Sequence, residues 1–146
     1  MLPENTILKT IDPLMTGELL AILSDMGHGD EIVLVDANFP AARAAQRLVR
    51  LPGIGIDCAA EAILSLFPLD DFVAAPAAVM ACPNGRPEIF DDFDRLLAAA
   101  EGKPVTVAQI DRFDFYDRAE QAYAVVATGE RRHYANLILK KGVLRA

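Results

Sequence analysis

The sequence contains few cysteines, few histidines and no concentrated positive charge. Its 146 residues include two cysteines and two histidines, and the formal net charge is −7. Cys58 and Cys82 are isolated and form no CxxC spacing, which favours free thiols in a reducing cytoplasm. The basic residues are dispersed, so no patch can neutralise a phosphate backbone. We therefore expect no nucleic-acid partner.

Long apolar runs and targeting signals are also missing. No stretch approaches the roughly 18 uninterrupted apolar residues that span a membrane, so we expect no membrane partner. The first residues lack a basic region followed by an apolar core and a cleavage site. Hydrophobic residues nevertheless make up 53% of the chain, and we expect the excess to face other subunits of a homo-oligomer. The length fits one domain over residues 1–146, long enough to bury a sizeable core.

Helix and strand patterns alternate along the chain. Residues 1–8 carry no periodic pattern and are predicted to form an arm. A break at Pro76 predicts an edge or bulged strand there, and the short loop between the last two strands requires an antiparallel pair. The alternation predicts an α/β fold, a layered α/β/α domain with a mixed sheet. Helices are predicted over residues 17–26, 40–50, 59–66, 87–100 and 114–121, and strands over residues 32–36, 55–57, 72–82, 105–110, 122–127 and 136–139.

His28 is the first candidate for chemistry. It lies between Gly27 and Gly29, so neighbouring side chains cannot cover its ring, and we expect an exposed imidazole on a tight bend. Histidine suits proton transfer because its ordinary pKa lies near neutrality; the alternative is an ordinary exposed loop residue. His133 lies in a charged turn and is expected to be solvated. Two histidines far apart in sequence, without cysteine partners, predict no metal site.

Polar side chains elsewhere could bind a sugar. Asp36 ends a predicted strand, where α/β proteins place their chemistry, although an aspartate there can also cap its loop. Arg112 offers a fixed cation with several donors, or a salt bridge at a helix start. Tyr134 and Asn136 supply a phenol and an amide at the entry to the last strand, where ordinary edge-strand packing is the alternative. Hydroxyl, amide and guanidinium together suit sugar binding.

Two long segments resemble the family of ribose pyranases and fucose mutarotases. MGHGDEIVLVDANFP, residues 26–40, and RFDFYDRAEQAYAVVATGERRHYANLILKKGV, residues 112–143, occur in the family's order and spacing, and LKTIDPL near the start matches as well. The resemblance covers nearly the whole chain. It implies an isomerase that needs no metal or organic cofactor. It also implies a ring-shaped homo-oligomer, a decamer of stacked pentamers with pockets near subunit contacts.

The resemblance also implies residue roles. His28 corresponds to the family's proton-transferring histidine, and the sugar contacts correspond to Asp36, Arg112 and the segment Tyr134, Ala135 and Asn136. Asp70 matches an aspartate of the family and is expected on that ground to bind the sugar, although by itself it is typical of a solvated turn. The ribose-type branch usually has histidine at the position of Arg112, so the arginine followed by phenylalanine favours the fucose-type branch. An extended N-terminus and a divergent region over residues 52–86 depart from the family pattern, and sugar selectivity could differ there.

We therefore expect an aldose mutarotase that interconverts the α and β anomers of a monosaccharide, L-fucose, with His28 and Tyr134 or a water as proton carriers. The alternatives are a D-ribose pyranase and a non-catalytic sugar-binding or transport-accessory protein. One geometric difficulty remains. Eight residues separate His28 from Asp36, and a strand advances about 3.3 Å per residue, so the two could lie more than one sugar apart. Either the bend folds back over the strand, or a neighbouring chain completes the pocket.

Overall fold

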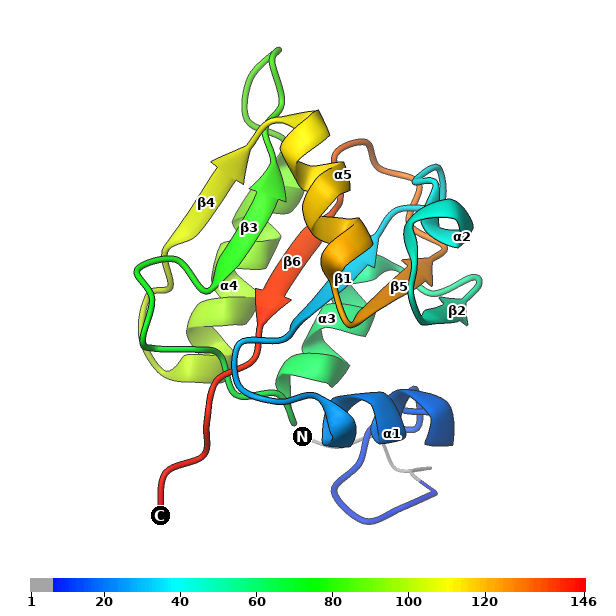
Figure 1. Cartoon of the computed structure of the whole chain (residues 1–146), viewed down its shortest axis with the longest axis vertical. Helices are drawn as coiled ribbons and strands as arrows, with labels where there is room; N and C mark the ends of the chain where they lie inside the picture. Colours follow the sequence, from blue (N-terminus) through cyan, green and yellow to red (C-terminus); the bar gives the residue numbers. More distant parts are fainter. Residues whose placement is uncertain (1–6) are drawn as a thin grey trace.

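The strands form a single mixed sheet with helices on both faces (Figure 1). The computed structural model describes residues 7–146, so the predicted arm over residues 1–8 lies outside the described part except for its last two residues. The strands are β1 (Glu31–Val35), β2 (Leu48–Leu51), β3 (Ala77–Met80), β4 (Val107–Ile110), β5 (Ala124–Thr128) and β6 (Leu137–Lys140). The helices are α1 (Gly17–Asp25), α2 (Ala41–Ala44), α3 (Ile56–Leu64), α4 (Glu88–Glu101) and α5 (Arg112–Gln121).

The sheet has the strand order β2-β5-β1-β6-β3-β4. β6 runs antiparallel to both of its neighbours, with Leu34 opposite Leu137 in β1 and Ala78 opposite Ile138 in β3. The pairs β1–β5, β2–β5 and β3–β4 are parallel. The predicted mixed sheet is confirmed. The predicted antiparallel pairing of the last two strands is wrong, because the loop over residues 129–136 crosses the end of β1 and places β6 on its far side.

The sheet is covered on both faces, as the layered prediction requires. Alternate residues of β1 point to opposite faces: Ile32 and Leu34 join the larger core under α1, α3 and α4, and Val33 and Val35 join the smaller core under α2 and α5. Figure 1 shows α5 on one side of the sheet and α3 and α4 on the other. β1 is thus buried on both faces, so the residues at its two ends are held in place by the packing of the sheet.

Several helix ends follow local rules of the sequence. The hydroxyl of Thr16 accepts a hydrogen bond from Leu19 N at 3.2 Å and caps α1. Asp111 caps α5 in the same way through Asp114 N at 2.9 Å. Gly102 ends α4 with φ of 74°, a left-handed conformation that glycine adopts without strain. The helices predicted over residues 17–26, 87–100 and 114–121 are confirmed, with bounds that differ by one or two residues.

Two predictions in the first half of the chain are wrong. The helix predicted over residues 40–50 is only the short α2, and its second half is strand β2, because pairing with β5 satisfies the backbone of this segment. The strand predicted over residues 55–57 is the beginning of α3, for which Gly55 is the N-cap. Neither outcome follows from the local sequence pattern. β2 pairs with β5, and the first amide of α3, Ile56 N, donates to the side chain of Glu130, so both depend on residues distant in sequence.

Two further strands occupy positions other than those predicted. β3 is an interior strand between β6 and β4, and Pro76 precedes it, where its carbonyl accepts Lys140 N at 2.9 Å. β4, predicted as buried, is one of the two edge strands of the sheet and is partly exposed. Within residues 7–146, the helices are all too short or too polar to cross a bilayer.

Candidate functional site

His28 lies in the turn between α1 and β1. The turn is closed by Gly27 N, which donates to Asp30 Oδ2 at 2.7 Å, and by Asp30 N, which donates to the Gly27 carbonyl at 3.1 Å. Gly29 adopts a φ of 89°, which requires glycine. The imidazole side chain is 43% exposed. The exposed ring on a tight bend is therefore present as the flanking glycines predict.

Asp70 lies against His28 although 42 residues separate them in sequence. Its Oδ1 lies 3.1 Å from His28 Nε2 and also accepts Phe72 N at 3.0 Å. The bond from the Phe72 amide and the contact with His28 hold the pKa of the Asp70 carboxyl below its usual value, although the residue is buried. An ionised carboxylate only accepts hydrogen bonds, so His28 Nε2 is the donor, and within residues 7–146 Nδ1 has no hydrogen-bond partner. Asp70 is thus not the solvated turn residue that its sequence neighbourhood suggests.

Phe72 is a member of this site that sequence reasoning missed. Its ring centroid lies 5.0 Å from that of His28, and 65% of the residue is exposed. The guanidinium of Arg145 lies 5.1 Å from the ring centroid and binds both oxygens of Asp71, at 2.7 and 3.0 Å. The signal in the sequence was an aromatic residue two positions after Asp70, but the segment was interpreted as a strand.

Asp36 and Asn136 form a second cluster at the other end of β1. Asp36 N donates to Asn136 Oδ1 at 2.9 Å, and Asn136 Nδ2 donates to Asp36 Oδ2 at 3.3 Å. Asp36 Oδ1 also accepts Asn38 N at 2.9 Å, so the carboxylate caps its own loop. Burial raises the pKa of the Asp36 carboxyl, and the hydrogen bonds from Asn38 and Asn136 partly offset this effect.

Three further residues predicted to contact the sugar, Arg112, Tyr134 and Ala135, lie at the same end of the sheet as Asp36, whereas Asp70 lies with His28 at the other end. Tyr134 is half-buried and has a left-handed φ of 62°, and Ala135 after it is fully buried. Arg112 is the first residue of α5, exposed, with its guanidinium 4.9 Å from the ring centroid of Phe113. His133 is exposed, as predicted. Exposed and half-buried hydrogen-bond donors, those of Arg112 and Tyr134, therefore lie at the end of the sheet where the C-termini of β1 and β4 are found.

A cavity of about 510 Å³ opens beside Asp36 at this edge. Phe39, from the same loop as Asp36, packs edge-on against Phe115 of α5, with ring centroids 5.8 Å apart. Arg43 and Arg50 also line the cavity, and sequence reasoning missed both. Arg50 was hidden by the prediction of a helix through residues 40–50, since a helix would not have placed it at the end of a strand.

The predicted residues form two clusters rather than one. The cluster of His28 and Asp70 precedes β1, and the cluster of Asp36 and Asn136 follows it; five strand residues alone span roughly 15 Å. The bend does not fold back over the strand, because Gly29 N is held by the Lys141 carbonyl at 2.8 Å, beyond the end of β6. Of the two arrangements left open by the sequence, the folded-back bend is thus wrong.

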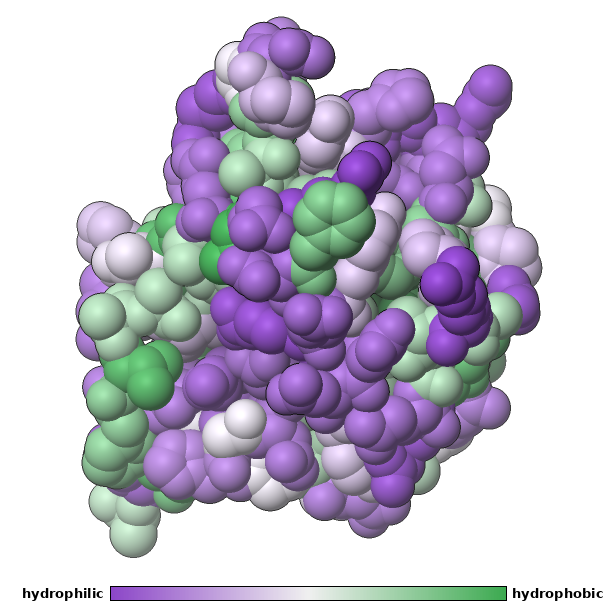
Figure 2. All heavy atoms as spheres, turned by 45° about the horizontal axis from the view of Figure 1, so that its top comes forward, coloured by the Kyte–Doolittle hydropathy of each residue, from purple (hydrophilic) through white to green (hydrophobic). Residues whose placement is uncertain are grey.

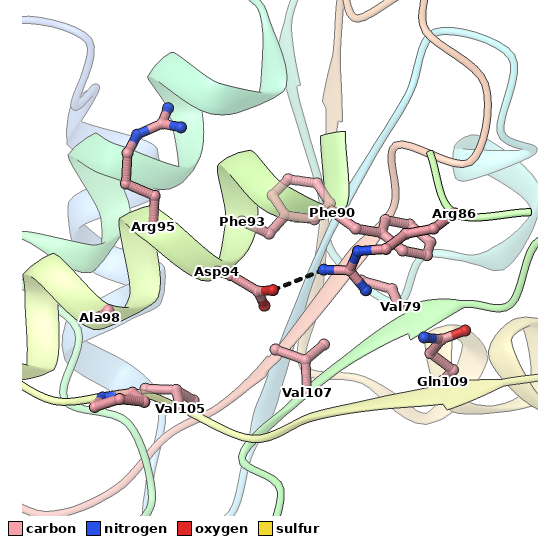
Figure 3. A pocket seen from close by; sticks show the side chains of 11 residues that line it. Val79, Arg86, Phe90, Phe93, Asp94, Arg95, Ala98, Val105, Val107 and Gln109 are labelled. Atoms are coloured by element: carbon pink, nitrogen blue, oxygen red, sulfur yellow. Dashed lines mark hydrogen bonds and ion pairs between the residues drawn. The ribbon is translucent and has the colours of Figure 1, made fainter. Parts of the chain in front are cut away.

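A separate cavity of about 530 Å³ lies between α4 and the strands β3 and β4 (Figure 3). Its floor is apolar, with Phe90 and Val107, and the ion pair of Arg86 with Asp94, 2.7 Å apart, crosses its rim. None of the residues predicted for sugar binding lines it. Within the described part of the chain, no three His, Cys, Asp or Glu side chains form a metal-binding group.

Comparison with known proteins adds an independent line of argument. Residues 9–144 match the model of the RbsD / FucU transport protein family. The chain is 48% identical over 140 residues to the L-fucose mutarotase of Glaesserella parasuis, with 94% of this chain and 96% of the relative covered. It is 47% identical over 146 residues to the fucose mutarotase of Homo sapiens, with 94% of each chain covered. The fold is similar to that of the Streptococcus pneumoniae fucose mutarotase in its crystal structure with L-fucose, with a TM-score of 0.89, 42% identity, and 94% of this chain and 100% of the other covered.

Proposed function

The chain belongs to the RbsD / FucU transport protein family, and on that premise we propose that it is an L-fucose mutarotase, an isomerase that interconverts the α and β anomers of this sugar. The structural observation that carries the proposal is the exposed imidazole of His28, fixed by the buried carboxylate of Asp70 at 3.1 Å. A protein that only binds sugar has no need of a proton-transferring group held in one orientation. The relatives named as fucose mutarotases support L-fucose as the substrate.

The orientation of His28 determines which nitrogen works on the sugar. Nε2 donates to Asp70, so Nδ1 presents its lone pair and takes the proton from the anomeric hydroxyl. A second carrier, Tyr134 or a bound water, protonates the ring oxygen as its bond to the anomeric carbon breaks. The open-chain aldehyde then rotates and recloses with the proton transfers reversed. Each well-placed proton transfer contributes about 10²- to 10⁴-fold to the rate, and Asp70 stabilises the imidazolium that forms in between.

The second cluster holds the sugar hydroxyls in this proposal. Asn136 provides an amide and Arg112 a set of fixed donors, while Asp36 accepts hydrogen bonds from hydroxyl groups. Since this cluster lies at the opposite end of β1 from His28, one chain does not supply both parts of a pocket. We therefore propose that a neighbouring copy completes it, in a homo-oligomer that the family resemblance implies to be a decamer.

The surface beside His28 suits contact with another copy. Exposed hydrophobic side chains gather on the segment between α3 and β3 and on the C-terminal tail, and they form the green area at the lower left of Figure 2. Phe72 is 65% exposed and Leu144 is 85% exposed, and monomeric proteins rarely leave such patches uncovered.

Both cysteines are free thiols, which supports a reducing cytoplasm as the location of this protein.

The direct test is exchange NMR of the anomeric protons of L-fucose and D-ribose with the wild-type protein and with His28→Ala. We expect faster exchange for L-fucose, and its loss in the variant while the fold stays intact, because the substitution removes no core volume. His133→Ala is the matched control and should keep wild-type exchange. Exchange of D-ribose alone would identify a pyranase instead, and binding without exchange would identify a sugar-binding protein.

The shared pocket has its own test. His28→Ala and Arg112→Ala are each expected to be inactive, whereas mixed oligomers, formed by refolding the two together, should regain part of the activity because some pockets then combine two intact clusters. Light scattering on the same samples gives the number of subunits. Mixed oligomers that stay inactive would contradict the shared pocket.

A further inference from the structure

Lys141 contacts three segments: the end of α1, the His28 turn, and Leu69 next to Asp70. Its Nζ donates to the carbonyls of Leu23, at 2.7 Å, and of Met26. These carbonyls belong to the last turn and C-cap of α1, a helix that has no basic residue of its own in that turn. A cation there both satisfies free carbonyls and suits the negative end of the helix dipole. The side chain of Lys141 therefore fixes the end of the helix that leads directly into the His28 turn.

The backbone of Lys141 holds the turn itself. Gly29 N donates to the Lys141 carbonyl at 2.8 Å, and Lys141 N donates to the Asp30 carbonyl at 2.8 Å. These two bonds extend the antiparallel pairing of β1 and β6 by one step beyond the strands. Lys141 therefore binds the chain on both sides of His28: the end of α1 before it and the turn residues Gly29 and Asp30 after it.

The same segment holds the Asp70 loop from the other side. Asp70 N donates to the Lys140 carbonyl at 3.0 Å, and Gly142 N donates to the Pro68 carbonyl at 2.8 Å. A Cβ atom at Gly142 would clash with the Leu69 carbonyl oxygen, so the backbones of the two segments are in close contact. Residues 140–142 thus lie between the two loops whose side chains meet at the 3.1 Å contact of His28 with Asp70.

We infer that Lys141 is a positioning residue for the mutarotase reaction: by joining the end of α1 and the His28 turn to the segment that carries the Asp70 loop, it holds His28 Nε2 against Asp70 and keeps Nδ1 directed to the sugar. The inference rests on the proposed function, since the orientation of the imidazole matters for catalysis only if His28 transfers the proton. It concerns a residue that does not touch the sugar.

The test compares Lys141→Met with Lys141→Arg and with the matched control Lys140→Met. Lys141→Met keeps the length of the stem and removes the donors, whereas Lys141→Arg keeps donors. Lys140 lies one position earlier, where its Nζ is 3.8 Å from Glu31 Oε2, and it makes no contact with the α1 carbonyls. ¹⁵N NMR of labelled histidine in mildly alkaline solution reports which ring nitrogen carries the proton, and His133→Asn assigns the two signals.

We expect the wild type, Lys141→Arg and Lys140→Met to carry the His28 proton on Nε2, and Lys141→Met to give a mixture of both tautomers. Exchange NMR at varied L-fucose concentration should give a kcat about 10- to 100-fold lower for Lys141→Met, since small misplacements of a reacting group have effects of this size. Its KM should stay unchanged, because the sugar hydroxyls are held elsewhere. If Lys141→Met does not fold, Lys141→Gln, which keeps a neutral amide donor group but removes the charge, replaces it with the same expected direction.

The two readouts separate the possible failures. A Lys141→Met protein that keeps both the Nε2 proton and the wild-type kcat would overturn the positioning role. A rise in KM with kcat unchanged would overturn it as well, because that result assigns Lys141 to sugar binding. If the wild type itself does not accelerate exchange, the proposed function fails, and the tautomer comparison still decides whether Lys141 orients the ring.

Discussion

Glu130→Gln is expected to destabilise the protein in a pH-dependent way. The carboxylate of Glu130 is 9% exposed and accepts hydrogen bonds from the backbone amides of Ile56, Arg131 and Arg132, at 3.3, 3.0 and 3.1 Å. It also accepts Arg132 Nε at 3.0 Å and Nη2 at 2.9 Å. The guanidinium of Arg132 is the largest cause that lowers the pKa of Glu130 from 4.5 to about 2, and the amides of Arg132 and Ile56 add to it.

The magnitude follows from this pKa difference. About 1.4 kcal/mol for each pKa unit gives an upper figure of about 3 kcal/mol for the ionised Glu130 in the folded state. Arg132 is 46% exposed, and solvent screening at that side reduces the expected loss to about 2 kcal/mol. Because the folded pKa lies below the unfolded one, this contribution is complete above pH 4.5 and is lost as the pH falls to about 2.

Urea unfolding at one fixed protein concentration measures the effect. At neutral pH the Glu130→Gln variant should unfold with a free energy about 2 kcal/mol below that of the wild type, since a neutral amide also turns a donor toward donors. The difference should shrink as the pH falls from 4.5 toward 2, where the wild-type carboxyl takes up its proton. A difference that stays constant over this range would refute the assignment of Glu130 as an ionised acceptor.

Two further substitutions test the close backbone packing at Gly142 and the burial of the Asp36 carboxyl. Gly142→Ala should lower the melting temperature and anomer exchange, because its Cβ would clash with the Leu69 carbonyl oxygen, whereas Gly17→Ala, with nothing within 4 Å, should lower neither. The Asp36→Asn variant should become more stable relative to the wild type as the pH rises from 4 to 7. Burial raises the pKa of Asp36, so its ionisation destabilises the folded wild type. Urea unfolding free energies that change in parallel with pH in the two proteins would contradict this.

Local signals in the sequence predicted the elements whose ends are decided locally. The hydroxyl of Thr16 and the conformation of Gly102 end their helices through contacts within a few residues, and the apolar run before Asp36 is a strand that both cores bury. Residues 45–50 were mispredicted because their partner, β5, is more than seventy residues away along the chain. The strand order of the sheet could not be predicted for the same reason, since it depends on where the loop after β5 places β6.

The candidate site was predictable as a set of residues but not as an arrangement. The glycines around His28 announced an exposed ring, and the family motifs supplied Asp36, Arg112 and Asn136. That Asp70 would meet His28 could not be read from local patterns, because the contact depends on both segments pairing with residues 140–142. Phe72 was missed because its segment was interpreted as a strand, and Lys141 had no signal of its own, since a lysine at the end of a strand is common.

The central place of β6 affects how the protein can be made. The last strand of the chain lies between β1 and β3 and joins the two parallel halves of the sheet, so neither half has its inner edge covered until residues 137–140 arrive. Synthesis from the N-terminus therefore leaves two open strand edges until β6 has been made, and such edges favour aggregation. A chain that ended before residue 137 would keep strands β1 to β5 but could not close its sheet.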